Sequence, residues 1–219
     1  GKPALEGLPA TYTQEDTEAD TLEILLRDEL LGVELTLLYT IFQNENAIAR
    51  SARFQNHGAV DYQLTTAMSL CLDLPDDDYE WIQFSGAWGR ERYVKSRRLQ
   101  QGIQSVGSTR GASGHFHNPF VVCKRPQADE FQGEVMGFSL VYSGNFLAQA
   151  EVDTFHVTRM MIGIHPAGFS WCLKPGGSFQ TPEAVLVYSD GGMNAMSQTF
   201  HRLYRTRLAR GVWRDKERP

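Results

Sequence analysis

The sequence has few cysteines and no long apolar run, and both absences narrow the class of protein. Its 219 residues include Cys71, Cys123 and Cys172, which lie far apart and form no CxxC pair. An odd number of separated cysteines argues against a disulfide framework, so we expect three small hydrophobic residues buried in strands. No apolar segment approaches the roughly 18 residues that a membrane-spanning helix needs. We therefore expect no membrane partner, and we expect no signal peptide at the start of the chain.

The sequence also lacks an excess of positive charge and the common sequence motifs of enzymes. The net charge is −5, which disfavours a general nucleic-acid binder. The sequence holds no GxGxxG, GxxxxGK[ST] or GxSxG motif, so it shows no dinucleotide, P-loop or hydrolase-elbow signature. A Ser-His-Asp triad stays open because its members can come from anywhere in a chain. With 42% hydrophobic and 21% charged residues, the composition is that of a globular protein.

What the sequence does contain is a long series of strand patterns. Between residues 33 and 41 apolar and mostly polar residues alternate, and the same period of two runs from Tyr62 to Leu72. Turn residues such as Asn56-His57-Gly58 and Ser143-Gly144-Asn145 separate the patterns. This predicts a mainly β protein, an antiparallel β-sandwich or barrel. The other expected strands are 21–28, 48–55, 103–108, 119–124, 134–142, 146–153, 157–163 and 184–188.

One helix is expected near the C-terminus, over residues 192–210. Apolar residues from Met193 to Leu208 recur at helical spacing, and several arginines occupy the other side. Asp190 or Asn194 is expected to cap its start, and Gly211 follows its end. The arginine-rich face is interpreted as a solvated face of a helix packed on a sheet. An arm that binds nucleic acid is the alternative, and the net negative charge of the whole chain argues against it.

Two clusters of polar residues are candidate metal sites. His115 and His117 form an HxH pair, which on a strand would point both rings to one side, as in a cupin. Their surroundings indicate a turn, so histidines that anchor a loop by hydrogen bonds are the favoured interpretation. Asp76-Asp77-Asp78 lacks the ligand spacing of a calcium loop and is expected to be a solvated turn between strands. We expect no metal and no cofactor.

Trp88 is the candidate binding residue. It stands between Gly86-Ala87 and Gly89, and charged residues follow it. A large ring with such small neighbours often stands out from a loop, where its apolar face suits a sugar. A tryptophan folded back onto the sheet is the other interpretation of the same pattern. Trp81, between Tyr79 and Ile82, is expected in a strand, although it would join Trp88 in a stand-alone sugar-binding platform.

Five segments carry a resemblance to a known family. They are WIQFSGAWGRERYVK (81–95), RGASGHFHNPF (110–120), GEVMGFSLVYSGNFLAQAEVD (133–153), PGGSFQTPEAVLVYSDGGMNAMSQTFHRLYR (175–205) and RGVWRDKERP (210–219). Together they resemble the N-terminal β-domain of bacterial α-galactosidases of glycoside hydrolase family 36. The resemblance runs through nearly the whole chain. It implies a β-supersandwich that precedes a catalytic (β/α)8 barrel.

The resemblance implies a function for the whole protein and a supporting role for this chain. The family is usually cytoplasmic and often homotetrameric, and it releases terminal α-galactose from melibiose, raffinose and stachyose, with retention and without a metal. Its nucleophile lies in a Lys-Trp-Asp motif of the barrel, and this tripeptide is absent here. The chain is therefore expected to be a partial, non-catalytic single domain (1–219). Its residues 211–219 would link to the barrel, and an earlier stretch of the family would supply its first strands.

One site residue carries over from the family. A tryptophan at the position of Trp88 lies beside the galactose pocket of the barrel, so the resemblance favours a substrate-binding role for Trp88. The family motif also includes His115 and His117, for which no catalytic role follows. Two other classes stay open: a stand-alone carbohydrate-binding β-sandwich, and a cupin-type metal enzyme that uses His115 and His117.

Overall fold

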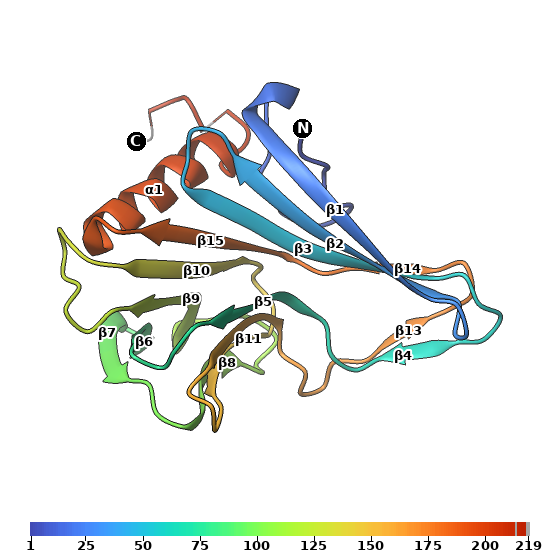
Figure 1. The fold of residues 1–219 in the computed structure, drawn as a ribbon. Coiled ribbons are helices and arrows are strands. Elements are labelled where there is room, and N and C mark those ends of the chain that lie inside the picture. Colours follow the sequence, from blue (N-terminus) through green and yellow to red (C-terminus); the bar gives the residue numbers. More distant parts are fainter. Residues whose placement is uncertain (213, 218–219) are drawn as a thin grey trace.

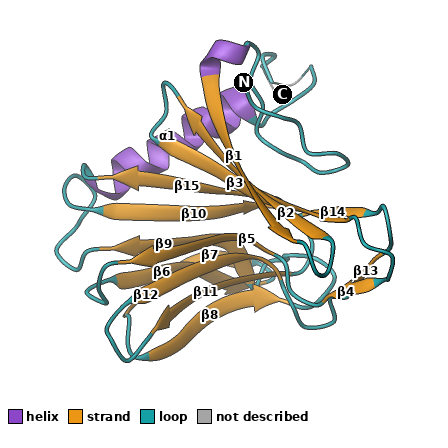
Figure 2. Cartoon of the chain, turned by 45° about the vertical axis from the view of Figure 1, so that its right-hand side comes forward, coloured by secondary structure: helices purple, strands orange, loops and turns teal. Residues whose placement is uncertain are grey.

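The alternating sequence patterns form two stacked antiparallel sheets, with a helix on the outer face of the larger one. The structure is a computed structural model, and it describes residues 1–212 and 214–217. Figure 1 shows the chain, and Figure 2 shows the smaller sheet and the helix on opposite sides of the larger sheet. The expected mainly β sandwich with one C-terminal helix is confirmed within the described residues.

The larger sheet has the order β1-β2-β3-β15-β10-β9-β6-β7, with β14 paired to β3. The smaller sheet has the order β5-β12-β11-β8, and β13 pairs with β4 in a separate two-stranded ribbon. The strands are β1 (Ala19–Asp28), β2 (Val33–Phe42), β3 (Ala47–Asn56), β4 (Tyr62–Leu64), β5 (Met68–Leu74), β6 (Glu80–Ala87), β7 (Arg90–Arg98), β8 (Gly102–Ser108), β9 (His117–Lys124), β10 (Val135–Val141), β11 (Phe146–Val152), β12 (Thr158–Ile164), β13 (Trp171–Leu173), β14 (Ser178–Gln180) and β15 (Glu183–Ser189). A 3-10 turn, η1 (Asp16–Glu18), precedes them, and α1 (Gly192–Arg207) follows them.

Two hydrophobic clusters hold these layers together. Trp81, Phe138, Phe146 and Met160 belong to the cluster between the sheets, and each is at most 1% exposed. Burying side chains of this size stabilises the fold by about 1.5–3 kcal/mol each. The second cluster lies between α1 and the outer face of the larger sheet. Its members include Ala47, Val135, Val185, Val187, Met196, Phe200 and Leu203.

The start of α1 is capped by backbone groups. The N-cap position is Gly191, and no side chain caps it, so the expected cap by Asp190 or Asn194 is wrong. The amide of Met193 donates to the Asp129 carbonyl at 2.9 Å, and that of Asn194 to the Glu130 carbonyl at 2.9 Å. The β9–β10 loop thus satisfies amides that a capping side chain would otherwise bond. The helix ends at Arg207, three residues before the expected end at residue 210.

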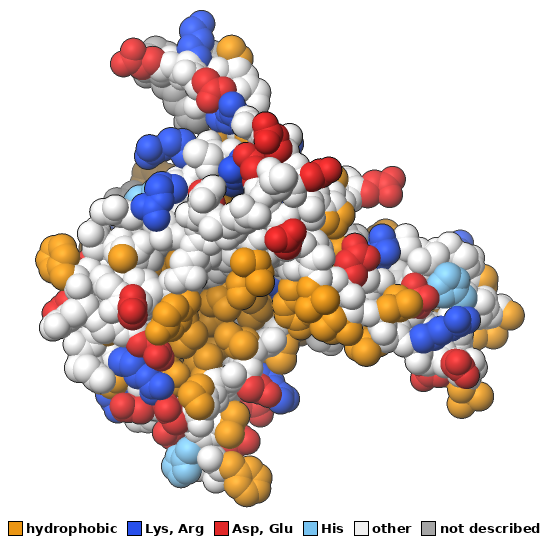
Figure 3. Space-filling view, turned by 45° about the horizontal axis from the view of Figure 1, so that its top comes forward, with side chains coloured by type: hydrophobic (Ala, Val, Ile, Leu, Met, Phe, Trp, Pro, Cys, Tyr) orange, Lys and Arg blue, Asp and Glu red, His pale blue; other side chains and the backbone are white. Residues whose placement is uncertain are grey.

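The smaller sheet does not cover the whole inner face of the larger one. It contacts β3, β15, β10 and β9, whereas leucines and isoleucines of β1 and β2 stay in solvent. Leu22 is 60% exposed, Leu26 47% and Ile41 56%. The register aligns Leu22 with Tyr39, so these side chains belong to one face of the sheet. We call this face of β1 and β2 the overhanging face. Figure 3 shows a patch of apolar side chains near the centre of one face of the molecule.

Several details differ from the sequence predictions. The single strand expected from Tyr62 to Leu72 is divided, because residues 65–67 carry the chain from the ribbon to the smaller sheet. Strands β7, β13 and β14 were not among those expected, and of β6 only the part around Trp81 was. Cys123 is buried as expected, but Cys71 and Cys172 are exposed, which corrects that prediction. Cys71 lies on β5 and Cys172 on β13, and both are short strands with one side open to solvent. Of the expected linker 211–219, residues 213, 218 and 219 lie outside the described residues.

Candidate functional site

The hairpin formed by β6 and β7 carries the candidate binding residue at its tip. Trp88 and Gly89 make the turn between the two strands, and Gly89 adopts a φ of 74°, which favours glycine. The Gly89 amide donates to the Glu91 carboxylate at 3.0 Å. Trp88 is 85% exposed. The expectation of a tryptophan that stands out among small neighbours is therefore confirmed, whereas its role in binding sugar stays a prediction.

Trp81 lies on the same hairpin and has the opposite environment. It is fully buried in the core between the sheets. The expectation that Trp81 lies in a strand is correct. A platform made of Trp81 together with Trp88 is excluded, because a buried indole offers no face to a sugar. The alternative of a stand-alone sugar-binding module loses one of its two rings.

The hairpin is bent just before its tip. Strand β6 shifts register between Ser85 and Ala87. Gly86 sits at the bend, where a Cβ atom would clash with the backbone of Arg90 and Glu91. Across the bend, Arg92 has a φ of 63°, a left-handed conformation that costs a non-glycine residue about 1 kcal/mol or more. The bend therefore fixes the direction in which the tip, and with it Trp88, leaves the sheet.

A chain of four hydrogen-bonded side chains runs along the inner face of β6. The Trp81 indole Nε1 donates to Gln83 Oε1 at 3.0 Å, and Gln83 Nε2 donates to Ser85 Oγ at 2.8 Å. Ser85 Oγ lies 2.9 Å from His117 Nδ1, across the register that pairs β6 with β9. Burial lowers the pKa of His117, which favours the neutral ring.

The two histidines of the HxH pair do different things. His117 is the first residue of β9, whereas His115 lies in the preceding turn and packs against Phe116 with ring centroids 4.6 Å apart. The expectation of a turn is correct for His115 and wrong for His117. A histidine that anchors the loop by a hydrogen bond is confirmed for His117. No group of histidine, cysteine and carboxylate side chains that could hold a metal is found in the described part of the chain.

The expected solvated turn at Asp76-Asp77-Asp78 does connect β5 and β6, but each carboxylate pairs with an arginine or a histidine. Asp76 lies 2.5 Å from Arg125, and Asp78 lies 2.6 Å from Arg98. Asp77 lies 2.8 Å from His156. These contacts tie the turn to β7, to the segment after β9 and to the β11–β12 turn. The run therefore has a structural role.

An apolar groove lies between the outer face of the β6–β7 hairpin and α1. Its volume is about 730 Å³. Its walls are aromatic: Phe120 packs edge-on against Phe200 with centroids 5.1 Å apart, and Phe84 and Tyr204 flank this pair. Burial raises the pKa of the Tyr204 phenol, and an interaction with the Ser139 side chain offsets part of this shift. The other lining residues are Ile82, Arg92, Val94, Asn118, Val122, Glu130, Met193, Met196, Ser197 and His201.

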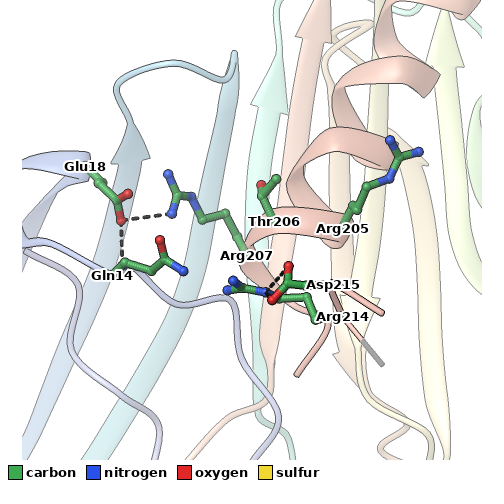
Figure 4. Close-up of a pocket in the computed structure, with 7 residues that line it drawn as sticks. All are labelled: Gln14, Glu18, Arg205, Thr206, Arg207, Arg214 and Asp215. Atoms are coloured by element: carbon green, nitrogen blue, oxygen red, sulfur yellow. Dashed lines mark hydrogen bonds and ion pairs between the residues drawn. The ribbon is translucent and has the colours of Figure 1, made fainter. Parts of the chain in front are cut away.

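A second, smaller cavity of about 320 Å³ lies where the N-terminal segment meets the end of α1 (Figure 4). Arg207 pairs with Glu18 at 2.9 Å, and Arg214 pairs with Asp215 at 2.9 Å. Arg214 also donates to the Tyr12 hydroxyl at 3.0 Å. Most of the charges that line this cavity thus bind one another, which fits a structural clasp between the two ends of the described chain better than a ligand site.

The sequence did not predict the hydrogen-bond chain or the groove. Gln83 and Ser85 carry no recognisable motif, and Ser85 meets His117 only because β6 pairs with β9, 32 residues away. The spacing of Trp81, Gln83 and Ser85 by two residues was the available signal, since it places all three on one face of a strand.

Comparison with known proteins identifies the family. Residues 1–174 match the family model described as the glycosyl hydrolase family 36 N-terminal domain, and residues 178–219 match the model described as Melibiase. The chain belongs to glycosyl hydrolase family 36. It is 58% identical to the α-galactosidase AgaA of Geobacillus stearothermophilus and 42% identical to the α-galactosidase Mel36A of Lactobacillus acidophilus, in both cases over its full length.

The solved structures agree with this assignment. The crystal structure of AgaA superposes on the whole chain with a TM-score of 0.99, and the α-galactosidase of Lactobacillus brevis does so with 0.98 at 44% identity. Variants of AgaA have been crystallised in complex with stachyose and with raffinose. The chain spans 30% of the length of each of these proteins. Residues 1–174 are thus a family 36 N-terminal domain. Among the described residues, no helix is long and apolar enough to cross a membrane.

Proposed function

We propose that this chain is the non-catalytic N-terminal domain of a retaining α-galactosidase that acts on raffinose-type oligosaccharides, melibiose included. The observation that carries the proposal is the 58% identity and the TM-score of 0.99 to AgaA over the whole chain. Retaining hydrolysis needs two carboxylates about 5–5.5 Å apart across the scissile bond. We expect both in the (β/α)8 barrel of the parent protein, and no metal or cofactor takes part.

The apolar groove between α1 and the hairpin is proposed as the surface on which the rest of the parent protein packs. The match to the Melibiase model begins at residue 178 and includes α1, so one wall of the groove comes from that part of the sequence. Phe84, Phe120, Met193 and Phe200 supply the apolar area expected at an interface between domains. Residues 211–219 would then lead from α1 into the barrel.

Trp88 is proposed to form one wall of the galactose site. Its 85% exposure at the tip of the hairpin leaves the indole face free for the C–H groups of a sugar, and its N–H free for a hydroxyl. The hairpin also borders the groove, because Ile82, Phe84, Arg92 and Val94 line it. A barrel packed in the groove would lie beside the tip.

The proposed parent protein is a cytoplasmic homotetramer, and the three free cysteines suit a reducing compartment.

A domain exchange tests this function. The 219 residues replace the matching segment of AgaA, and hydrolysis of raffinose and stachyose is measured. The 58% identity predicts a chimera that folds and keeps activity. The isolated chain, assayed in parallel, is expected to leave a nitrophenyl α-galactoside intact. A chimera that folds like AgaA yet hydrolyses no α-galactoside contradicts the proposal, and so does persistent hydrolysis that copurifies with the isolated chain.

A further inference from the structure

We propose that Ser85 and His117 are positioning residues that hold the β6–β7 hairpin so that Trp88 meets the sugar. The inference rests on the proposed function, because it assumes that Trp88 contacts the substrate. It starts from the hydrogen-bond chain that ends at His117. Neither Ser85 nor His117 lies at the tip, so both would act through the hairpin rather than by touching the sugar.

The first two bonds of the hydrogen-bond chain have a fixed direction, set by its buried end. An indole N–H can only donate, so the Trp81 ring requires the oxygen of the Gln83 amide, and the amide nitrogen faces Ser85. The Ser85 oxygen accepts that bond, which leaves its own hydrogen free to be donated to His117 Nδ1. Each of the three bonds then has one donor and one acceptor when the His117 ring is neutral and carries its proton on Nε2. The fully buried Trp81 anchors this chain in the core.

Ser85 is also the last point at which the side chains of the hairpin are tied to the rest of the sheet. The pairing of β6 with β9 ends at Ser85 and His117, and the Gly86 amide donates to the Phe116 carbonyl at 3.0 Å. Beyond this point β6 and β7 pair only with each other among the described strands, since β7 is the edge of the sheet. The direction of the tip thus depends on the anchor at its base.

The exposure of Trp88 explains why the bond at the base of the hairpin is important. Its ring is 85% exposed, so contacts with its own domain do little to fix its place. A side chain that must meet a substrate needs its position held within a fraction of an ångström. The bond between Ser85 and His117 would hold the base of the hairpin in place, and with it the Trp88 ring, which few neighbouring side chains contact.

The test uses the active chimera or the parent enzyme, with kcat and KM measured for raffinose. Ser85→Ala removes the donor to His117, and His117→Leu removes the acceptor. We expect each to lower kcat/KM by about fivefold, because a slightly misplaced contact is poorly used in the transition state. Ser85→Thr keeps the hydroxyl and is expected to restore kcat/KM. Ser96→Ala is the matched control: its hydroxyl bonds Glu80 near the base of the same hairpin, and kcat/KM should stay unchanged.

The decisive comparison repeats Ser85→Ala in a Trp88→Ala background. If Ser85 acts through Trp88, the second substitution changes kcat/KM by less than about twofold. Equal losses in both backgrounds, or no loss from Ser85→Ala beside a clear loss from Trp88→Ala, overturn the positioning role and leave the proposed function standing. If Trp88→Ala itself leaves kcat/KM unchanged, the proposed role of Trp88 falls, and the positioning role falls with it.

Discussion

Trp81 and Trp88 lie on one hairpin, seven residues apart in the chain, yet Trp81 is fully buried and Trp88 is 85% exposed. This difference arises because Trp81 lies in a strand inside the sandwich, whereas Trp88 lies at the tip of the hairpin, which extends out of the sandwich. Trp81 belongs to the core between the sheets and donates its indole N–H to Gln83. The same residue type therefore serves stability at one position and is free for recognition at the other.

The buried ion pair between Lys2 and Glu183 is expected to hold the N-terminal segment to the sheet. Their charged groups lie 2.6 Å apart, and both side chains are at most 3% exposed. Glu183 also accepts bonds from the amide and hydroxyl of Thr11. Lys2→Met leaves a buried carboxylate without its cation, so it should lower the free energy of unfolding by about 3–5 kcal/mol. Denaturant titration of the purified chain measures this.

The exposed pair of Arg159 and Asp73 provides the control for that measurement. Its groups lie 2.7 Å apart, but both side chains are about half exposed. Arg159→Ala should therefore lower the free energy of unfolding much less than Lys2→Met does. A loss from Lys2→Met as small as that from Arg159→Ala would show that the N-terminal segment contributes little to the fold.

His156 is expected to titrate above an ordinary histidine. Its hydrogen bond to Asp77, at 2.8 Å, raises the pKa of the imidazole above the usual 6.5. The folded-state pKa is the higher one, so the pair contributes stability at pH values below the unfolded pKa. That contribution is lost as the pH rises through the raised folded value. NMR titration should show the His156 pKa falling in Asp77→Asn, and an unchanged pKa in the variant would exclude this pairing in solution.

The overhanging face is expected to make the isolated chain self-associate. Leu22, Ile24 and Leu26 present apolar surface along β1, which is also an unpaired sheet edge. Light scattering should detect oligomers at high concentration, together with binding of an apolar dye. The double variant Leu22→Thr and Leu26→Thr should shift the chain toward the monomer. A wild-type chain that stays monodisperse and binds no dye contradicts this prediction.

The sequence patterns predicted the strands in which apolar and polar residues alternate. They did not predict an exposed edge strand or the point at which the chain passes from one sheet to another. Strands β2, β3, β10 and β11 bury one or both faces, so their patterns are clear. Strand β7 is exposed along its whole length as the edge of the sheet, and its run of charged residues gives no apolar signal. The alternation from Tyr62 to Leu72 continues through a change of sheet, which a local pattern does not reveal.

The candidate site divides in the same way. The exposure of Trp88 follows from its small neighbours, and this local feature was predicted correctly. The contact between Ser85 and His117, and the groove between the hairpin and α1, join segments far apart in the sequence. Only the pairing of β6 with β9 and the packing of α1 bring them together, so they required the structure.

The central claim is tested most directly by comparing Trp88→Ala and Trp81→Ala in the active chimera or the parent enzyme, for both kcat/KM and thermal unfolding. Losing a partly desolvated sugar contact should cost about 1–3 kcal/mol, or about a ten- to hundredfold drop in kcat/KM. Trp88→Ala should show this loss with little change in Tm, whereas Trp81→Ala should lose about 3–5 kcal/mol of stability. Wild-type kcat/KM in Trp88→Ala, together with a Tm many degrees lower, would contradict the account.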